Sequence, residues 1–220
     1  MADQEFHYDV LIVGAGNAAC SAAHSALEKK ATVGILEKAS KGNRGGNSAL
    51  TGHMRFVFNG FDDVRPLVKN MSDADLHQLL ERMPHRTEAE HWDEIMQVTN
   101  NQSDQEMLQV HVTESRNTVH WLASKGHDWV PAPATNDNVL SVNGGGAGLQ
   151  ERSFTMLERA GAAFHYETAA MELLEDKTGR VTGVRGGTRS VAGADDQNVI
   201  VEYLICHFFP LNKSCFLRCL

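Results

Sequence analysis

The sequence has few cysteines, no long apolar run and no basic cluster, and each absence argues against a class of protein. No stretch of about eighteen apolar residues occurs, so no transmembrane helix is expected. The net charge of −8, without a basic cluster, argues against nucleic acid or an anionic membrane as a partner. The N-terminal stretch MADQEFHYD lacks the basic region and apolar core of a secretory signal.

Cysteine and histidine are present, but not at the spacing of disulfide or metal sites. None of the four cysteines forms a C-x-x-C pair: Cys20, Cys206, Cys215 and Cys219. This usage fits a reducing compartment better than a disulfide scaffold, and a cytoplasmic location is expected. The eleven histidines are scattered without a spacing such as H-E-x-x-H, so we interpret them as surface or packing residues and expect no metal.

The segment from Tyr8 to Ala39 has the pattern of a strand, a turn, a helix and a second strand. Two apolar runs, Val10–Val13 and Val33–Leu36, predict the strands, and the first is short enough to be buried on both faces. An alanine-rich stretch predicts a helix over about 17–30. The turn reads G-x-G-x-x-A, which in this order of elements indicates a dinucleotide-binding unit; the alternative is a purely structural turn.

The residues of the turn suit a pyrophosphate ligand. Gly14 allows the chain to turn sharply, and Gly16 has no side chain to keep a pyrophosphate away from the backbone. The free amides at the helix start would face the phosphate charge, and they belong to Asn17, Ala18 and Ala19. Ala19 is also small enough for close packing of the helix on the strand.

The second strand ends in an acid. The carboxylate of Glu37 can accept hydrogen bonds from both hydroxyls of a ribose, and it would repel a 2′-phosphate. The next two residues, Lys38 and Ala39, are candidate cofactor contacts beside it. The site predicted so far lies where these two strands end.

A glycine- and asparagine-rich loop, KGNRGGNSALTGH at 41–53, follows directly. An NAD-binding domain would usually continue here with a second strand–helix–strand unit, so the loop argues against NAD. Its glycines free the backbone for close approach to a ligand, and three side chains supply donors and acceptors: Asn47, Ser48 and Thr51. The alternative is an ordinary surface loop.

Three segments, GAGNAACSAA, LEKA and RGGNSALTG, together resemble the flavoprotein subunit family of fumarate reductase and succinate dehydrogenase. EHWDEIMQVT and TVHWLASKGHDWVP are similar to its tricarballylate dehydrogenase-like branch. The resemblance implies an FAD-dependent oxidoreductase acting at a carbon–carbon bond next to carboxylates. It also implies FAD contacts in the loop, at Gly46, Asn47, Ser48, Thr51 and Gly52.

The resemblance carries further expectations about the cofactor and the chemistry. Covalent members have a flavin-linked histidine near the position of Gly46, so non-covalent FAD is implied, and the backbone near Ala170 is implied to contact adenine. His53 replaces a glycine common in the family. The expected partner is a small carboxylate substrate, and the electron partner is left open. No catalytic residue is assigned, because the groups that handle substrate in full-length members come later in the chain. The alternative function is a truncated, non-catalytic FAD-binding fragment.

The rest of the pattern predicts helices and then strands. Helix starts at Ser72, Thr87 and Ser103 define a helical insertion at about 62–130, after an irregular stretch from 55 to 69. Trp92, Trp121 and Trp129 are interpreted as core residues. A glycine run at 143–148, either an anion site or a flexible turn, precedes a helix at about 149–160 that Gly161 ends. Strands are predicted at 163–174, 180–185 and 198–205.

The predicted fold class is α/β: a Rossmann-like FAD-binding domain with a parallel sheet, a small β meander and a helical insertion. The resemblance covers about 6–187, with a weaker continuation to 202, so 1–202 is interpreted as a partial FAD-binding domain. The tail at 203–220, YLICHFFPLNKSCFLRCL, has neither helix nor strand periodicity. We interpret this anomalous tail as the mark of a truncated or misread product; the alternative is a genuine terminus that packs on the domain.

Overall fold

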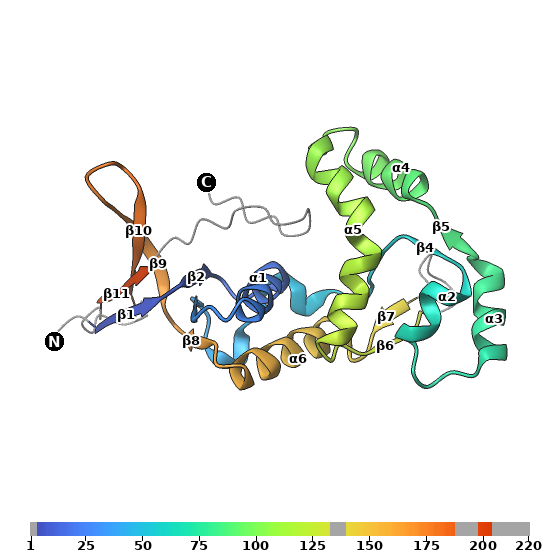
Figure 1. The fold of residues 1–220 in the computed structure, drawn as a ribbon, viewed down its shortest axis with the longest axis horizontal. Helices are drawn as coiled ribbons and strands as arrows, with labels where there is room; N and C mark the ends of the chain where they lie inside the picture. Colours follow the sequence, from blue (N-terminus) through green and yellow to red (C-terminus); the bar gives the residue numbers. More distant parts are fainter. Residues whose placement is uncertain (1–3, 133–139, 188–197, 204–220) are drawn as a thin grey trace. The chain divides into compact units, whose positions relative to one another are not determined.

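A computed structural model of the protein describes residues 4–132, 140–187 and 198–203 (Figure 1). The chain divides into two compact units. The first unit comprises Met1–Ala49 and Ser153–Leu220, and the second comprises Leu50–Arg152. The range of 62–130 expected for a helical insertion lies within the second unit, and the tail from 204 onward lies outside the described residues.

A parallel sheet in the first unit contains the predicted strand–helix–strand. Strands β2 (Val10–Val13), β3 (Val33–Leu36) and β8 (Ala163–His165) pair in the order β2-β3-β8, all parallel. Helix α1 (Asn17–Glu28) connects β2 to β3. The parallel sheet and both strand positions predicted from the apolar runs are confirmed.

Strands β2 and β3 differ in burial, and this corrects one expectation. All four residues of β3 are buried, as an inner strand of a parallel sheet requires. In β2 only Ile12 is buried, and Val13 is 57% exposed. The expectation that β2 is buried on both faces is therefore wrong. Among the described residues its only strand partner is β3, so β2 is an edge strand of this sheet as described.

Small side chains on α1 form the core of the first unit. Cys20, Ala23 and Ala26 are buried against the sheet strands. The other wall comes from the end of helix α6 (Gly145–Arg159), through Phe154 and Leu157. The alanine-rich helix packs closely because its buried residues add little volume.

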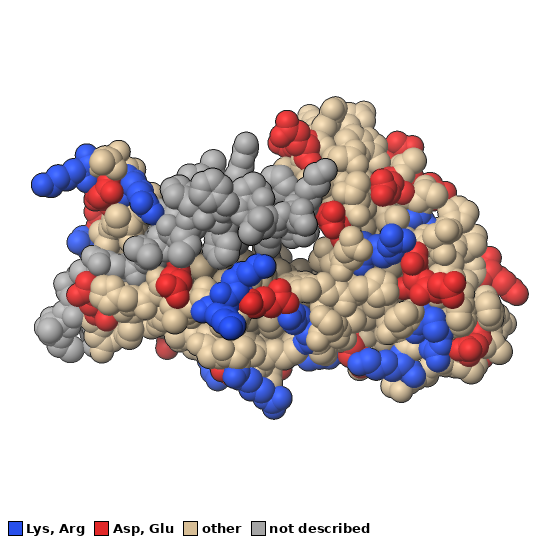
Figure 2. Space-filling model, viewed as in Figure 1, with Lys and Arg blue, Asp and Glu red and all other residues tan. Residues whose placement is uncertain are grey.

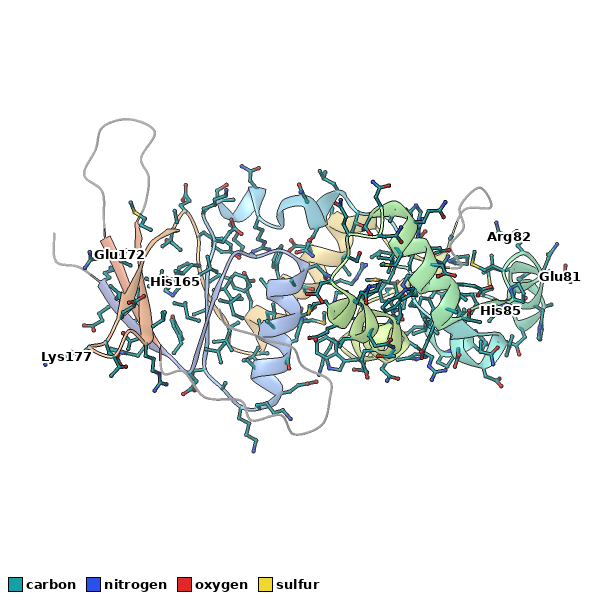
Figure 3. All side chains as sticks on the ribbon, turned by 90° about the horizontal axis from the view of Figure 1, so that it is seen from above. Glu81, Arg82, His85, His165, Glu172 and Lys177 are labelled. Carbon is teal, nitrogen blue, oxygen red and sulfur yellow. The ribbon has the colours of Figure 1, made fainter. Side chains whose placement is uncertain are left out.

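A second sheet of the first unit is the predicted β meander with one added strand. Strands β9 (Ala169–Glu175), β10 (Val181–Gly187) and β11 (Asn198–Tyr203) pair antiparallel in chain order. Strand β1 (Gln4–Tyr8) pairs parallel with β11 and was not predicted, because its sequence QEFHY has no apolar run. His165, labelled in Figure 3, connects the two sheets: its Nε2 lies 2.8 Å from the Tyr8 hydroxyl and its ring 4.5 Å from that of Phe6.

The single strand predicted at 163–174 is wrong. The segment forms two strands in two different sheets, β8 and β9. Glu167 lies between them with φ 54, and its amide donates to the carbonyl of Ala39. An L residue in this left-handed region cannot continue a strand. The alternation of apolar residues does not reveal that the chain changes sheets at this point.

The second unit contains most of the helices: α2 (Phe61–Val64), α3 (Asp73–Arg82), α4 (Glu88–Val98), α5 (Gln105–Ser124) and the start of α6. Two predicted helix caps are confirmed. Ser72 Oγ accepts the Asp75 amide at 3.2 Å, and Thr87 forms a reciprocal capping box with Glu90. The third helix is capped by Asp104 instead of Ser103, since the Asp104 carboxylate accepts the Met107 amide.

The core of the second unit lies between α3, α5 and short strands. Those strands are β4 (Phe58–Asn59), β5 (His85–Arg86), β6 (Trp129–Pro131) and β7 (Leu140–Val142). The predicted stripe of α5 is buried: Leu108, Val112, Val119 and Leu122. Of the three tryptophans, Trp129 is buried in this core and Trp121 is partly buried and packs against it, whereas Trp92 is partly buried and does not belong to the cluster. The stretch from 55 to 69, expected to be irregular, contains β4, α2 and the 3₁₀ helix η3 (Arg65–Leu67).

Helix α6 begins earlier than predicted. The glycine run forms its first turn, so the helix starts at Gly145 instead of residue 149. The two glycines at its start, Gly144 and Gly145, have φ values of +73° and +62°, which favour glycine. Gly161, with φ +95°, follows its end as predicted. Part of the expected loop at 41–53 is also helical, as η1 (Lys41–Asn43) and η2 (Gly46–Leu50).

Candidate functional site

The turn after β2 needs glycine at its first position. Gly14 has φ +91°, and its amide donates to the Leu36 carbonyl at 2.7 Å. Gly16 has an ordinary φ of −78°, and a Cβ there would only reach van der Waals distance of Ser48 Oγ. Neither conformation nor packing within the chain requires glycine at position 16, so a closely approaching ligand is a sufficient reason for it.

The start of α1 presents amides at the surface. Gly16 is the N-cap and supplies no side-chain acceptor. The Asn17 amide donates instead to Ser48 Oγ at 3.0 Å, which joins the helix to the loop after β3. Within the described part of the chain, nothing accepts a hydrogen bond from the amides of Ala18 and Ala19. An α-helix leaves its first amides without internal acceptors, and these two are free to bind an anion.

Glu37 is a buried carboxylate with two backbone partners. Its Oε2 accepts the Ala15 amide and its Oε1 accepts the Ala39 amide, both at 2.8 Å. Sequence analysis predicted Glu37 as a ribose ligand but missed this second role. A carboxylate has about four acceptor positions, so these two bonds leave capacity for ribose hydroxyls. Glu37 therefore holds both the turn after β2 and Ala39 in place at the carboxyl ends of the strands. Lys38 between them is exposed.

The remaining predicted positions divide between the two units. Gly46, Asn47 and Ser48 lie on η2 in the first unit, with Gly46 and Asn47 exposed. Ala170 lies on β9 of the same unit, opposite Gly186. Its side chain is exposed, which agrees with a role for its backbone alone.

Thr51 and Gly52 belong to the second unit, where their carbonyls accept hydrogen bonds from the start of α6 and from the end of β7. The carbonyl of Thr51 accepts the Gly146 amide at 2.5 Å, and that of Gly52 accepts the Val142 amide at 3.2 Å. His53 bridges Ser141, with its Nδ1 at 2.9 Å from the hydroxyl. The glycine run at the start of α6 therefore already donates one amide to the chain itself.

The sequence analysis missed Arg44, a nearly buried arginine of the loop. Its side chain is only 6% exposed, and its guanidinium lies 4.1 Å from the ring centroid of Phe154. Nη1 donates to the Tyr166 hydroxyl and lies 3.2 Å from Glu158 Oε1. Pattern analysis gives no sign of this burial, because an arginine among glycines and asparagines is typical of a solvated loop.

Other groups near the turn do not suit catalysis. Cys20 is buried, and burial raises the pKa of its thiol to about 12, so it is protonated and unreactive at neutral pH. The other three cysteines lie outside the described residues. In the part of the chain that the structure describes, no group of three or more His, Cys, Asp or Glu side chains is arranged to hold a metal ion.

The residues at the carboxyl end of β2 and β3 fit a dinucleotide cofactor. The left-handed Gly14, the absence of a side chain at Gly16 and the free amides of Ala18 and Ala19 suit a pyrophosphate. The carboxylate of Glu37 suits a ribose, and ligands of open α/β sheets bind at this end of the strands. On the described residues of the face drawn in Figure 2, Lys and Arg side chains lie scattered among Asp and Glu.

Comparison with known proteins supports this cofactor. A family model described as an FAD binding domain matches residues 9–203. No curated protein sequence matches significantly. Among solved structures, a flavocytochrome c3 fumarate reductase is 19% identical with a TM-score of 0.64, over 90% of this chain and 32% of its own.

Two further structures share the fold. Mycobacterium smegmatis Sdh1 is 18% identical with a TM-score of 0.61, over 91% of this chain and 33% of its own. The 3-ketosteroid-Δ4-(5α)-dehydrogenase from Rhodococcus jostii RHA1 is 18% identical with a TM-score of 0.59, over 92% of this chain and 45% of its own. This chain therefore spans only a third to a half of the length of the structures it resembles.

None of the described helices combines the length and the apolar character needed to cross a bilayer. The fold, the dinucleotide turn and a family match over most of the chain agree with one another. The chain belongs to the FAD binding domain family.

Proposed function

We propose that this chain binds FAD non-covalently and serves an oxidoreductase of the fumarate reductase and succinate dehydrogenase type. The observation that carries the proposal is that the Gly14 turn, the start of α1 and Glu37 lie together at the carboxyl ends of β2 and β3. These residues offer free amides for a pyrophosphate and a carboxylate for a ribose. The fold shared with a fumarate reductase supports the type of reaction.

Each part of the cofactor has proposed ligands in the chain. The amides of Ala18 and Ala19 would hold the pyrophosphate, with Gly14 and Gly16 allowing its approach, while Asn17 connects this helix start to the loop. Glu37 would hold the ribose, with Lys38 and Ala39 beside it. The remaining proposed contacts come from Gly46, Asn47, Ser48, Thr51 and Gly52 around the pyrophosphate and flavin, and from the backbone of Ala170 at the adenine.

The chain's own part in the chemistry is binding and orientation. FAD, when bound, supplies hydride transfer, and the protein places and shields the reacting groups. The proposed substrate is a small carboxylate with a carbon–carbon bond next to its carboxyl group, of the succinate, fumarate or tricarballylate kind. No described residue is assigned the proton transfer or the recognition of substrate, and a cytoplasmic setting remains part of the proposal.

The first experiment measures cofactor binding. Purified protein is titrated with FAD, and in parallel with NAD, while flavin fluorescence or protein fluorescence is recorded. We expect saturable binding of FAD and none of NAD. Gly16→Val should abolish it, because the added methyl groups, next to Ser48 Oγ, would keep a pyrophosphate away from the backbone. Gly42→Val is the matched control, since a Cβ at Gly42 meets nothing within 4 Å.

A second measurement addresses the reaction. Reduced viologen with fumarate, and a dye acceptor with succinate or tricarballylate, are assayed with excess FAD. Turnover above free flavin that Gly16→Val removes would support the oxidoreductase proposal. FAD binding without turnover would favour the alternative of a non-catalytic FAD-binding chain. Failure of the folded wild-type protein to bind FAD would refute both.

A further inference from the structure

We propose that Arg44 is a positioning residue of the cofactor site, whose buried guanidinium fixes the segment from Gly45 to Ser48 against the start of α1. This inference rests on the proposed FAD site. Arg44 is not among the proposed cofactor contacts. It would act through the residues that follow it.

Several contacts hold the side chain of Arg44 in place. Only 6% of the side chain is exposed, although it carries a full charge. The guanidinium lies 4.1 Å from the ring centroid of Phe154 and 5.5 Å from that of Tyr166, within the range of cation–π contact. Nη1 also donates to the Tyr166 hydroxyl and pairs with Glu158 at 3.2 Å. A buried charge is costly unless it is paired, so the loop cannot move without losing these partners.

Two contacts connect the anchored arginine to the proposed pyrophosphate site. The next residue, Gly45, is buried with φ +101°, and its carbonyl lies 3.9 Å from the place of a Cβ on Gly16. Four residues after Arg44, Ser48 Oγ accepts the Asn17 amide at 3.0 Å. The anchor therefore sets how closely the loop lies over the helix start, and which amides of α1 stay open.

Ion pairs also hold Arg44 within the cluster. Glu158 faces two cations, with Lys41 Nζ at 3.1 Å and Arg44 Nη1 at 3.2 Å from the same oxygen. Burial acts to raise the pKa of Glu158, but the hydrogen bonds and charges of Lys41 and Arg44 outweigh it and lower the pKa. The carboxylate is thus ionised at neutral pH and forms ion pairs with both cations, which adds to the restraint on the Arg44 side chain. Lys41 is 62% exposed, so water screens its share of the field more than that of Arg44.

Arg44 is buried and Lys41 is exposed, although both pair with Glu158, so the two residues provide a matched pair of variants. Arg44→Met removes the buried cation, and Lys41→Met removes the exposed cation that shares Glu158. FAD dissociation constants are measured by titration at a temperature where thermal unfolding shows both variants folded. We expect Arg44→Met to weaken FAD binding by about tenfold to a hundredfold, because the loop would lose the charge-assisted bonds within the protein that hold it against α1. Lys41→Met should change it less than about threefold.

Two conservative variants separate positioning from plain stabilisation. Arg44→Lys keeps the charge but not the planar guanidinium over Phe154, and Tyr166→Phe removes one hydroxyl partner. Under the proposal both weaken FAD binding to an intermediate degree and alter the shape of the bound-flavin absorption band. A purely structural role would lower the melting temperature and leave the dissociation constant and the band of the folded protein unchanged.

The outcomes distinguish this inference from the function on which it rests. If the wild-type protein does not bind FAD, the proposed function fails. If the wild type binds FAD and folded Arg44→Met binds it equally well, the positioning role of Arg44 is overturned and the function stands. If Arg44→Met does not fold, Arg44→Lys and Tyr166→Phe decide: weaker binding supports the role, and unchanged binding refutes it.

Discussion

The carboxylate of Glu37 accepts the backbone amide of Ala15 at 2.8 Å. This bond connects the end of β3 to the middle of the turn that follows β2, although the two residues are far apart in sequence. A second bond from Glu37 to the Ala39 amide fixes the chain that leaves β3. One buried acid thus shapes the turn proposed to bind a pyrophosphate and is itself proposed to bind the ribose.

This double role predicts that Glu37→Gln impairs both binding and stability. The glutamine can offer one oxygen, but its NH₂ group would face a backbone amide, and an unsatisfied buried donor costs about 1–3 kcal/mol. We expect a lower free energy of unfolding and an FAD dissociation constant raised about tenfold or more. Denaturant unfolding and FAD titration measure the two effects.

Glu172→Gln is the control for this prediction. Glu172 is labelled in Figure 3 on β9, and its exposed side chain pairs with Arg185 at the surface. The change should alter stability by less than about 1 kcal/mol. Unchanged FAD affinity in Glu37→Gln would contradict the ribose assignment, and unchanged stability would contradict the importance of its two backbone bonds.

Gly14→Ala should destabilise the first unit through backbone strain alone. Gly14 has φ +91°, and a Cβ there meets nothing within 4 Å, so there is no steric clash to confuse the result. Forcing an L residue into the left-handed region costs about 1–2 kcal/mol. Gly42→Ala, where the Cβ also meets open space but no positive φ occurs, should be near neutral. Equal denaturation midpoints for the two variants would show that the turn relaxes without cost.

Thr87→Ala should destabilise the second unit by removing the cap of α4. Thr87 Oγ1 accepts the Glu90 amide at 3.1 Å, and the Glu90 carboxylate accepts the Thr87 amide at 2.7 Å. Loss of such a cap costs about 1 kcal/mol. Thr113→Ala removes the same atoms from the exposed interior of α5 and should cost less. Thermal unfolding of both variants measures the difference, and a smaller loss for Thr87→Ala than for Thr113→Ala would argue against the capping box.

Stability should fall as the pH decreases below about 6.5, because of two histidines between α4 and α5. The rings of His91 and His111 lie 5.2 Å apart. Burial lowers the pKa of both, and the charges of His111 and Arg86 lower that of His91 further, against the opposing effect of Glu94. Between the lowered pKa values of the folded protein and the ordinary histidine pKa, the unfolded chain therefore binds more protons than the folded protein. In this pH range the free energy of unfolding rises as the pH rises.

The measurement is the denaturation midpoint of the wild type and of His91→Gln between pH 5 and pH 8. The variant should show a shallower loss of stability on acidification, because one of the two neutral histidines is gone. Thr113→Ala, which removes no titratable group, should keep the slope of the wild type. An identical slope in His91→Gln would remove His91 from this account.

Bound flavin should leave the protein on denaturation. By resemblance, Gly46 in the segment RGGNSALTG lies near the position where covalent members of the family have a histidine. After acid precipitation of the FAD-loaded protein, we expect the yellow colour in the supernatant. Flavin fluorescence that stays with the protein band on a denaturing gel would show a covalent bond and refute this prediction.

The sequence by itself determined the elements that depend on local chemistry. The apolar runs predict the bounds of β2 and β3, and the alanine-rich stretch predicts α1. These elements can be predicted because their signals are runs of consecutive residues of one type. Ser72 and Thr87 begin α3 and α4 as their capping patterns indicate. The resemblance to an FAD-binding family came from the turn and the loop after Glu37, and the family match over residues 9–203 confirms it.

Only the tertiary structure decided what depends on partners distant in sequence. The division of 163–174 into β8 and β9 follows from pairing with β3 and β10, which local alternation does not encode. Strand β1 is defined by β11 near the other end of the described chain. Arg44 is buried because Phe154, Glu158 and Tyr166 come to it from α6 and the end of β8. A loop sequence cannot reveal such burial, because the energy that permits it comes from charges and rings supplied by other segments.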